Sequence, residues 1–170
     1  MTDALGVEDR TIRVGGRRRD ELMRALQTAG IRLNVHAETL LRHTVFDDPA
    51  GQDLRFVERT VHELGLATGG TQLQVFDAAR AAGLHLCPMI SGPFLRLATL
   101  GQPNAPDSIL SAGRPPTGAV HIASEALSDD EAYPKGFYLR MVDDEAWLRG
   151  YRCDDTYRWG PEQRVALVKP

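Results

Sequence analysis

The spacing of apolar residues predicts helices in the first half of the chain and strands in the second half. Three segments repeat apolar residues at the three- and four-residue intervals of an amphipathic helix: 18–29, 35–43 and 71–83. Gly30 and Gly83 stand where glycine commonly ends a helix. Asn34 precedes the second segment and Thr71 begins the third, and both side chains are suited to cap free N–H groups.

Short apolar runs between turn-forming residues predict strands in the rest of the chain. The expected strands or extended segments are 11–14, 54–61, 84–89, 94–100, 119–123, 137–142, 146–152 and 164–168. Residues 101–118 are rich in Pro, Gly, Ser and Asn and predict the main loop, and 128–134 predict an acidic turn. Helices followed by strands indicate an α+β fold, with N-terminal helices packed on a mostly antiparallel sheet and a C-terminal β-hairpin. We expect one domain over residues 1–170, with 1–16 loosely ordered.

Residues 136–159 are the most informative stretch, because aromatic residues and arginines alternate there. Seven of the eleven aromatic residues lie between Tyr133 and Trp159. Alternation on both sides of an acidic turn predicts a β-hairpin, and we place the turn at Asp144-Glu145. One face of the hairpin is then apolar and belongs to the core: Phe137, Leu139, Met141 and Leu148. The other face carries the aromatic and arginine side chains: Tyr138, Arg140, Val142, Trp147, Arg149 and Tyr151.

In this register Arg140 lies opposite Arg149, and two like charges at that separation repel by ~0.2–1 kcal/mol. An anionic ligand would neutralise them, and so would acidic residues from 128–131 or 154–155. Arginines also stack on aromatic rings without any ligand, and a three-residue turn would separate the two. We treat five residues as candidate ligand-binding residues, for an anionic or aromatic small molecule or a protein partner: Tyr138, Arg140, Trp147, Arg149 and Tyr151.

Candidate catalytic residues are few. His85 and Cys87 are two positions apart and share one face if their segment is a strand, so they could form a nucleophile and base or supply two metal ligands. The simpler interpretation is that Cys87 packs as a small hydrophobic side chain. His121, in the strand predicted at 119–123, is a third acid–base candidate. The sequence contains no CxxC, GxSxG or HExxH motif, so we expect no metal and no cofactor and leave enzymatic activity open.

We consider two other segments as binding sites, one for an anion and one for nucleic acid. Gly69-Gly70-Thr71 at a helix start could hold an anion on free N–H groups, but the lysine of a P-loop is missing and a capped turn is the simpler interpretation. Residues 60–84 could imitate a helix-turn-helix, but Arg80 is the one basic residue of the second helix.

Composition limits the partners. The formal net charge is −3, so binding to nucleic acid is unlikely on electrostatic grounds. No apolar run approaches the length of a membrane helix, and the acidic beginning is unlike a signal peptide, so we expect a cytoplasmic protein with no membrane contact. Cys87 and Cys153 are then expected to be free thiols, although the sequence leaves open whether they are near each other. Arginine greatly outnumbers lysine, which we attribute to a high-GC bacterial genome.

Four segments, distributed along most of the chain, resemble a family of small uncharacterised bacterial proteins. They are ELMRALQTAGIRLN, ELGLATGGTQLQVFDAA, GLHLCPMISGPFLRL and GFYLRMVDDEAWLRGYR, at residues 21–34, 63–79, 83–97 and 136–152. No activity or catalytic residue is established for this family, so the resemblance implies no function for any position here.

Three functional hypotheses remain. The first is a small module that binds a ligand or partner on the aromatic and arginine face of the hairpin. The second is a small-molecule enzyme of bacterial specialised metabolism, in which the same face lines a pocket and His85, Cys87 or His121 supplies the chemistry. The third is a regulator that binds nucleic acid.

Overall fold

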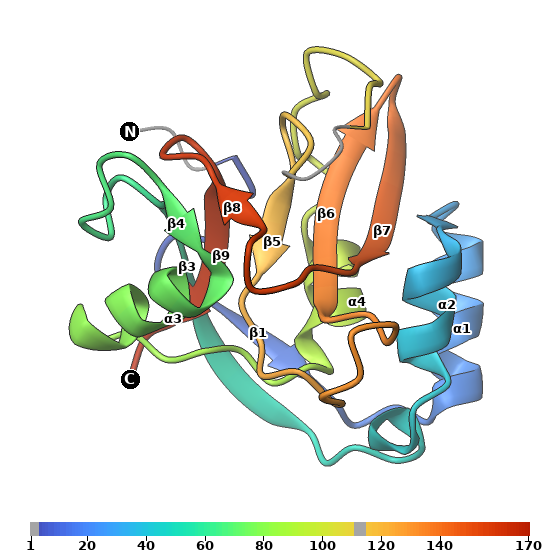
Figure 1. The fold of residues 1–170 in the computed structure, drawn as a ribbon. Helices are drawn as coiled ribbons and strands as arrows, with labels where there is room; N and C mark the ends of the chain where they lie inside the picture. The colour runs from blue at the N-terminus through green and yellow to red at the C-terminus, as the bar shows by residue number, and fades with distance from the viewer. Residues whose placement is uncertain (1–3, 111–114) are drawn as a thin grey trace.

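The computed structural model describes residues 4–110 and 115–170, which form an α+β fold with four α-helices and two β-sheets (Figure 1). The larger sheet contains seven strands, in the order β1 (Arg10–Val14), β3 (Gln52–Thr60), β9 (Arg164–Val168), β5 (Val120–Ile122), β6 (Gly136–Val142), β7 (Glu145–Tyr151) and β2 (Arg32–Leu33). Neighbouring strands are antiparallel except for β9–β5 and β7–β2, which are parallel. The predicted fold class is therefore confirmed.

Helices cover both faces of this sheet and create two cores. On one face lie α1 (Arg19–Thr28), α2 (Val35–Leu41) and α4 (Ser91–Ala98). They bury a leucine-rich core that includes Leu22, Leu40, Leu95, Phe137, Leu139 and Leu148. On the other face lie α3 (Gln72–Ala81) and a small antiparallel sheet of β4 (Gly70–Thr71) and β8 (Arg158–Trp159). They bury an aromatic core that includes Phe76, Tyr138, Tyr151, Trp159 and Val165. Figure 1 shows α1 and α2 beside β7, and α3 next to β4 and β8.

The predicted helix caps are confirmed. The Asn34 side chain accepts a hydrogen bond from the Ala37 backbone N–H (2.9 Å) at the start of α2. At the start of α3 the Thr71 hydroxyl accepts from the Gln74 N–H (3.3 Å), and the Gln74 side chain accepts from the Thr71 N–H (2.9 Å). This reciprocal pair is a capping box, which satisfies two N–H groups that a helix start leaves open.

One of the two segments predicted to be extended, 94–100, is wrong, and the other, 84–89, forms no regular strand. Residues 94–100 were expected to be extended, but most of them belong to helix α4. Pro93 is the third residue of that helix, where a proline is tolerated because first-turn N–H groups have no partner within the helix. Residues 84–89 form no strand either; their one ladder contact is an isolated antiparallel bridge between His85 and Val168.

Residues 4–16 are packed against the rest of the fold, whereas we expected loose order over 1–16; residues 1–3 lie outside the described residues. Leu5, Val7, Ile12 and Val14 are buried in the leucine-rich core. The carboxylate of Glu58 in β3 accepts hydrogen bonds from the backbone N–H groups of residues 4 and 5, at 3.2 and 2.9 Å. The described part of this segment is therefore fixed by both apolar burial and hydrogen bonds.

A helix-turn-helix is also excluded. Residues 61–69, between β3 and β4, form turns, so α3 has no preceding partner helix there. The hypothesis of a recognition helix in residues 60–84 loses its structural basis.

Candidate binding site

The hairpin of β6 and β7 turns at Asp143 and Asp144, one residue earlier than predicted. Both residues have positive φ angles, of 50° and 64°, as a two-residue turn between twisted strands requires. Arg140 is consequently opposite Trp147, and the predicted pairing of Arg140 with Arg149 is wrong. The partners shift by two positions, so every side chain keeps its predicted face. The repulsion between arginines that pointed to an anion is therefore absent at this position.

Arg140 is buried and holds the long loop against the hairpin. Its guanidinium donates from Nε to the carbonyl of Thr117 (3.0 Å) and from Nη2 to the carbonyl of Asp107 (2.9 Å). The same Nη2 lies 3.4 Å from the carboxylate of Asp107. The residue is 1% exposed. Its hydrogen bonds connect two separate positions of the loop, Asp107 and Thr117, to β6.

Two other candidates, Tyr138 and Tyr151, are also buried, and they surround His121. The His121 ring is stacked on Tyr138, with centroids 5.0 Å apart, and meets Tyr151 at 4.7 Å. Trp159 of β8 packs against the same imidazole at 4.7 Å. The structure thus brings one candidate catalytic residue and two candidate binding residues together inside the aromatic core.

Trp147 and Arg149 form the open half of the hairpin face. The Cζ atom of Arg149 lies 4.8 Å from the centroid of the Trp147 ring, and that of Arg32 lies 5.3 Å from it. Both distances are typical of cation–π contacts. Arg32 also pairs with Glu145 (2.9 Å). Arg149 donates from Nε to the uncharged hydroxyl of Tyr138 (2.8 Å), and within the described ranges it has no carboxylate partner.

Helix α2 contributes His36 to this part of the surface, near Arg149 and Arg152. The Asn34 side-chain amide bonds both the C=O (3.0 Å) and the N–H (2.8 Å) of Gly150, which fixes the start of α2 on β7. The pKa of His36 is lowered, first by partial burial and then by the positive charges of Arg152 and Arg149. The charges of both arginines therefore act on the imidazole of His36. We call this set of residues the arginine–tryptophan surface: Arg32, His36, Trp147, Arg149 and Arg152.

Sequence reasoning missed the contributions of Arg32, His36 and Arg152 to this surface. Arg32 reaches Trp147 because β2 pairs in parallel with β7, in the register Arg32 opposite Trp147. A two-residue strand carries too little pattern to reveal such a pairing, which joins segments more than a hundred residues apart. The one local signal was Asn34, recognised as a cap but not as a bridge to Gly150.

The three candidate catalytic residues are not brought together. His85 is exposed. Cys87 is buried in the leucine-rich core, where its Sγ donates to the Ala166 carbonyl (3.4 Å) and burial raises the pKa of its thiol well above the ordinary value. His121 lies in the aromatic core, on the other face of the sheet. Cys87 therefore has neither of the two candidate histidine bases as a hydrogen-bond partner.

The cysteines are both free and lie in different environments. Cys153 is half-buried beside the aromatic core, with its Sγ 3.0 Å from Oε1 of Gln72. Burial raises the pKa of Cys153 to about 11. Neither thiol has the low pKa of a reactive cysteine.

The glycines before α3 serve packing. A Cβ atom on Gly69 would lie 2.2 Å from the backbone oxygen of Trp159, and Gly69 has a φ of +83°. Gly70 pairs with Trp159 in the small sheet. The close approach of the Trp159 backbone explains why glycine is needed at position 69. The capping box already occupies the N–H groups of Thr71 and Gln74, which an anion bound at the helix start would need.

Comparisons of the chain with protein-family models, with curated proteins and with solved structures give no match. The resemblance to a bacterial family therefore stays a prediction. Within residues 4–110 and 115–170, no three His, Cys, Asp or Glu side chains are grouped so as to hold a metal ion. In the same residues, no helix has the length and apolar character needed to cross a bilayer.

Proposed function

We propose that this protein is a binding module for a small anionic ligand, which it holds on the arginine–tryptophan surface. The proposal keeps the open half of the hairpin face, Trp147 and Arg149, and leaves out Arg140, Tyr138 and Tyr151 as direct contacts. The anionic group, a phosphate or a carboxylate, accepts hydrogen bonds from the guanidinium of Arg149, and Arg152 adds positive charge.

One observation carries this proposal. Arg149 is held in place by two neutral groups, the Tyr138 hydroxyl and the Trp147 ring, and not by a carboxylate. Arginine side chains lose conformational entropy when they bind, which typically costs ~0.5–1.5 kcal/mol per side chain. A guanidinium that is already ordered avoids much of this cost and keeps its charge for the ligand. Other surface arginines, such as Arg13 and Arg55, are paired with aspartates.

A binding function is favoured over catalysis at this surface. Arg149 lies next to Tyr138, whose hydroxyl pKa is raised mainly by burial. A phenol that stays protonated donates and accepts hydrogen bonds but is a poor base near neutral pH. The remaining groups of the surface are two further arginines, an indole and His36. The lowered pKa of His36 favours the neutral imidazole, which could act as a base, but the surface contains no Ser, Thr or Cys nucleophile for it to activate.

The test uses the two tryptophans as separate reporters. Indole N–H resonances of uniformly 15N-labelled protein are assigned with the Trp147→Phe and Trp159→Phe variants. The protein is then titrated at low salt with inorganic phosphate, phenyl phosphate and benzoate. We expect the Trp147 and Arg149 side-chain resonances to shift in a saturable way, and the affinity to fall as salt is added because exposed charges are screened.

Arg149→Ala should weaken this binding by about tenfold or more, a typical effect of removing one charged hydrogen-bond donor. Arg24→Ala is the matched control, because Arg24 is an exposed arginine on α1 and lies outside the surface. Shifts that survive unchanged in Arg149→Ala, or no Trp147 shift with any of the three anions, would contradict the proposal.

A further inference from the structure

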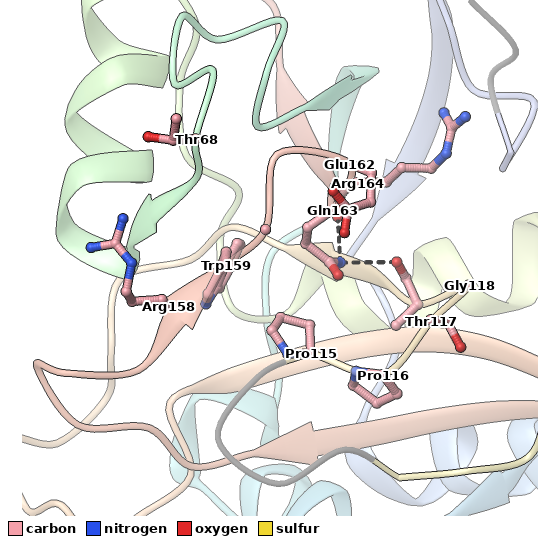
Figure 2. Close-up of a pocket in the computed structure, with 12 residues that line it drawn as sticks. Thr68, Pro115, Pro116, Thr117, Gly118, Arg158, Trp159, Glu162, Gln163 and Arg164 are labelled. Atoms are coloured by element: carbon pink, nitrogen blue, oxygen red, sulfur yellow. Dashed lines mark hydrogen bonds between the residues drawn. The ribbon is translucent and has the colours of Figure 1, made fainter.

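A cavity of about 610 Å³ lies between the end of the long loop and the segment that includes β8 (Figure 2). Residues 115–119 form one wall, residues 158–164 form the other, and Thr68 borders the same space. This volume is within the range of small-molecule sites, roughly 300–1,000 Å³. The cavity is separate from the arginine–tryptophan surface, since the two share no residue.

Trp159 is one of the residues that line this cavity, and its buried indole has an unused hydrogen-bond donor. Its residue is 1% exposed, and its ring is held by an edge contact with Phe76 (centroids 6.2 Å apart) and by the pairing of β8 with Gly70. In the described part of the chain, the indole Nε1–H has no hydrogen-bond partner. A buried N–H without an acceptor costs about 1–3 kcal/mol. An acceptor atom supplied from the cavity would recover this cost.

A second unused donor lies directly behind Trp159, on His121. The amide nitrogen of Gln163 faces two carbonyl oxygens, of Ala119 (2.9 Å) and Arg164 (3.0 Å), which fixes the orientation of the amide. The same nitrogen is 3.0 Å from Nδ1 of His121. Nδ1 must therefore accept, and the single proton of the neutral ring is on Nε2. Among described residues Nε2 also lacks a partner.

The two arginines around the cavity do not direct their charges toward Trp159, and the third charged residue of the lining, Glu162, is an acid. In Figure 2 the guanidinium groups of Arg158 and Arg164 extend away from Trp159 in different directions. Arg164 is bonded to the carboxylate of Glu58 in β3 (3.1 Å). The opposite wall contains Pro115 and Pro116, which have no backbone N–H to donate. An anion would therefore lose its hydration without meeting a cation, which costs far more than burying a carbonyl.

We propose that this cavity binds a small, neutral, planar molecule whose hydrogen-bond acceptor, a carbonyl oxygen or a ring nitrogen, takes the indole N–H of Trp159. Pro115, Pro116 and the indole are buried apolar groups of the lining, and the ring of the ligand packs against them once the wall has moved slightly. His121 acts as a positioning residue, because it packs against the indole and remains uncharged. Since Trp159 is almost completely buried, the acceptor reaches its N–H only after a small movement of the wall.

The experiment compares four ligands that share a phenyl ring and differ in the attached group. Acetophenone has a neutral acceptor, ethylbenzene has none, benzoate is an anion and benzylamine is a cation at neutral pH. Binding is followed by the Trp159 indole N–H resonance of the wild-type protein. We expect acetophenone to bind at least about tenfold more tightly than ethylbenzene or benzylamine and to move this resonance downfield, as a new hydrogen bond to a buried donor would. Benzoate should also bind more weakly than acetophenone.

Trp159→Phe keeps an aromatic ring and removes the N–H, so it should reduce the acetophenone affinity to that of ethylbenzene. Trp147→Phe is the matched control and should leave the acetophenone and ethylbenzene affinities, read at the Trp159 resonance, unchanged. Equal binding of acetophenone and ethylbenzene to the wild type would overturn the proposal. So would an unmoved Trp159 resonance, or tighter binding of benzoate than of acetophenone in the Arg149→Ala variant, whose arginine–tryptophan surface is weakened. These outcomes are independent of Trp147, so this site and the arginine–tryptophan surface succeed or fail separately.

Discussion

Arg149 and Tyr138 face each other across the β6–β7 hairpin, and Nε of Arg149 donates to the tyrosine hydroxyl at 2.8 Å. Tyr138 is stacked on His121, which in turn packs against Trp159. A single row of side chains thus runs from the open arginine–tryptophan surface to the lining of the cavity. Tyr138 is the member that belongs to both environments, because its hydroxyl meets the surface and its ring lies in the aromatic core.

Replacing Tyr138 with phenylalanine separates these two roles. The ring and its stacking on His121 are kept, whereas Arg149 loses the acceptor of its Nε–H. We expect about fivefold weaker binding of phenyl phosphate, because the guanidinium becomes more mobile, and a loss of about 0.5–1.5 kcal/mol in the free energy of unfolding. NMR titration and urea denaturation measure the two effects. An unchanged affinity would show that the hydroxyl does not position Arg149.

Arg140 should matter for stability and not for binding at the arginine–tryptophan surface. Arg140→Met keeps much of the aliphatic volume but leaves the carbonyls of Asp107 and Thr117 without their charged donor. We expect a loss of about 1–3 kcal/mol in the free energy of unfolding, measured with urea, and faster proteolysis of the loop at 101–118. Arg24→Ala, on an exposed site of α1, should change stability by less than about 0.5 kcal/mol. A loss in Arg140→Met as small as that of the control would contradict this role.

The hairpin shows what alternation along a sequence determines and what it leaves open. Side-chain faces were predicted correctly, because they depend only on the two-residue period of a strand. The pairing of Arg140 with Arg149 was wrong, because register depends on which two residues form the turn. Asp143 and Asp144 adopt positive φ angles, which aspartate tolerates better than most residues. Three consecutive acidic residues made the neighbouring position, Asp144-Glu145, equally plausible from the sequence.

The candidate site was harder to predict than the fold, since tertiary packing decides exposure. Nothing local distinguishes Arg140, which is buried by a loop from residues 101–118, from Arg149, which remains half-exposed. The cavity at Trp159 depends on Gln163, whose side chain joins Ala119 to Arg164 across two strands. A glutamine in a polar turn carries no sign of that function in the sequence.

Gly150 should be essential for the position of α2. A Cβ atom there would lie 2.6 Å from the backbone carbonyl carbon of His36 and 2.7 Å from the backbone nitrogen of Ala37. Both are backbone atoms, so Gly150→Ala must push α2 away from β7 and strain the two hydrogen bonds between Asn34 and Gly150. We expect a loss of about 1–3 kcal/mol in the free energy of unfolding.

Gly101→Ala is the matched control for that substitution. A Cβ atom on Gly101 would meet nothing within 4 Å, and its φ angle is not in the left-handed region. Its free energy of unfolding should stay within about 0.5 kcal/mol of the wild-type value. If both alanine variants unfold at the same urea concentration as the wild type, α2 is not fixed by close approach to β7.

His121 should make the protein less stable in acid. Complete burial lowers the pKa of His121 to about 3, whereas a histidine in an unfolded chain has a pKa of about 6.5. The unfolded state therefore binds a proton more readily, so this contribution to stability is fully present above pH 6.5 and is lost as the pH falls toward 3. Between pH 7 and pH 4 the loss is roughly 3 kcal/mol for a fully buried group.

His121→Phe preserves an aromatic ring between Tyr138 and Trp159 but removes the titrating group. The free energy of unfolding is measured with urea at pH 7 and at pH 4 for both proteins. Its decrease between the two pH values should be roughly 3 kcal/mol smaller in the variant than in the wild type. The wild-type protein provides an independent measurement, because the His121 ring resonances should not titrate between pH 7 and pH 4 while the fold persists. A ring that titrates near pH 6 would show that the imidazole is accessible to water, and the aromatic core around it would then not be closed.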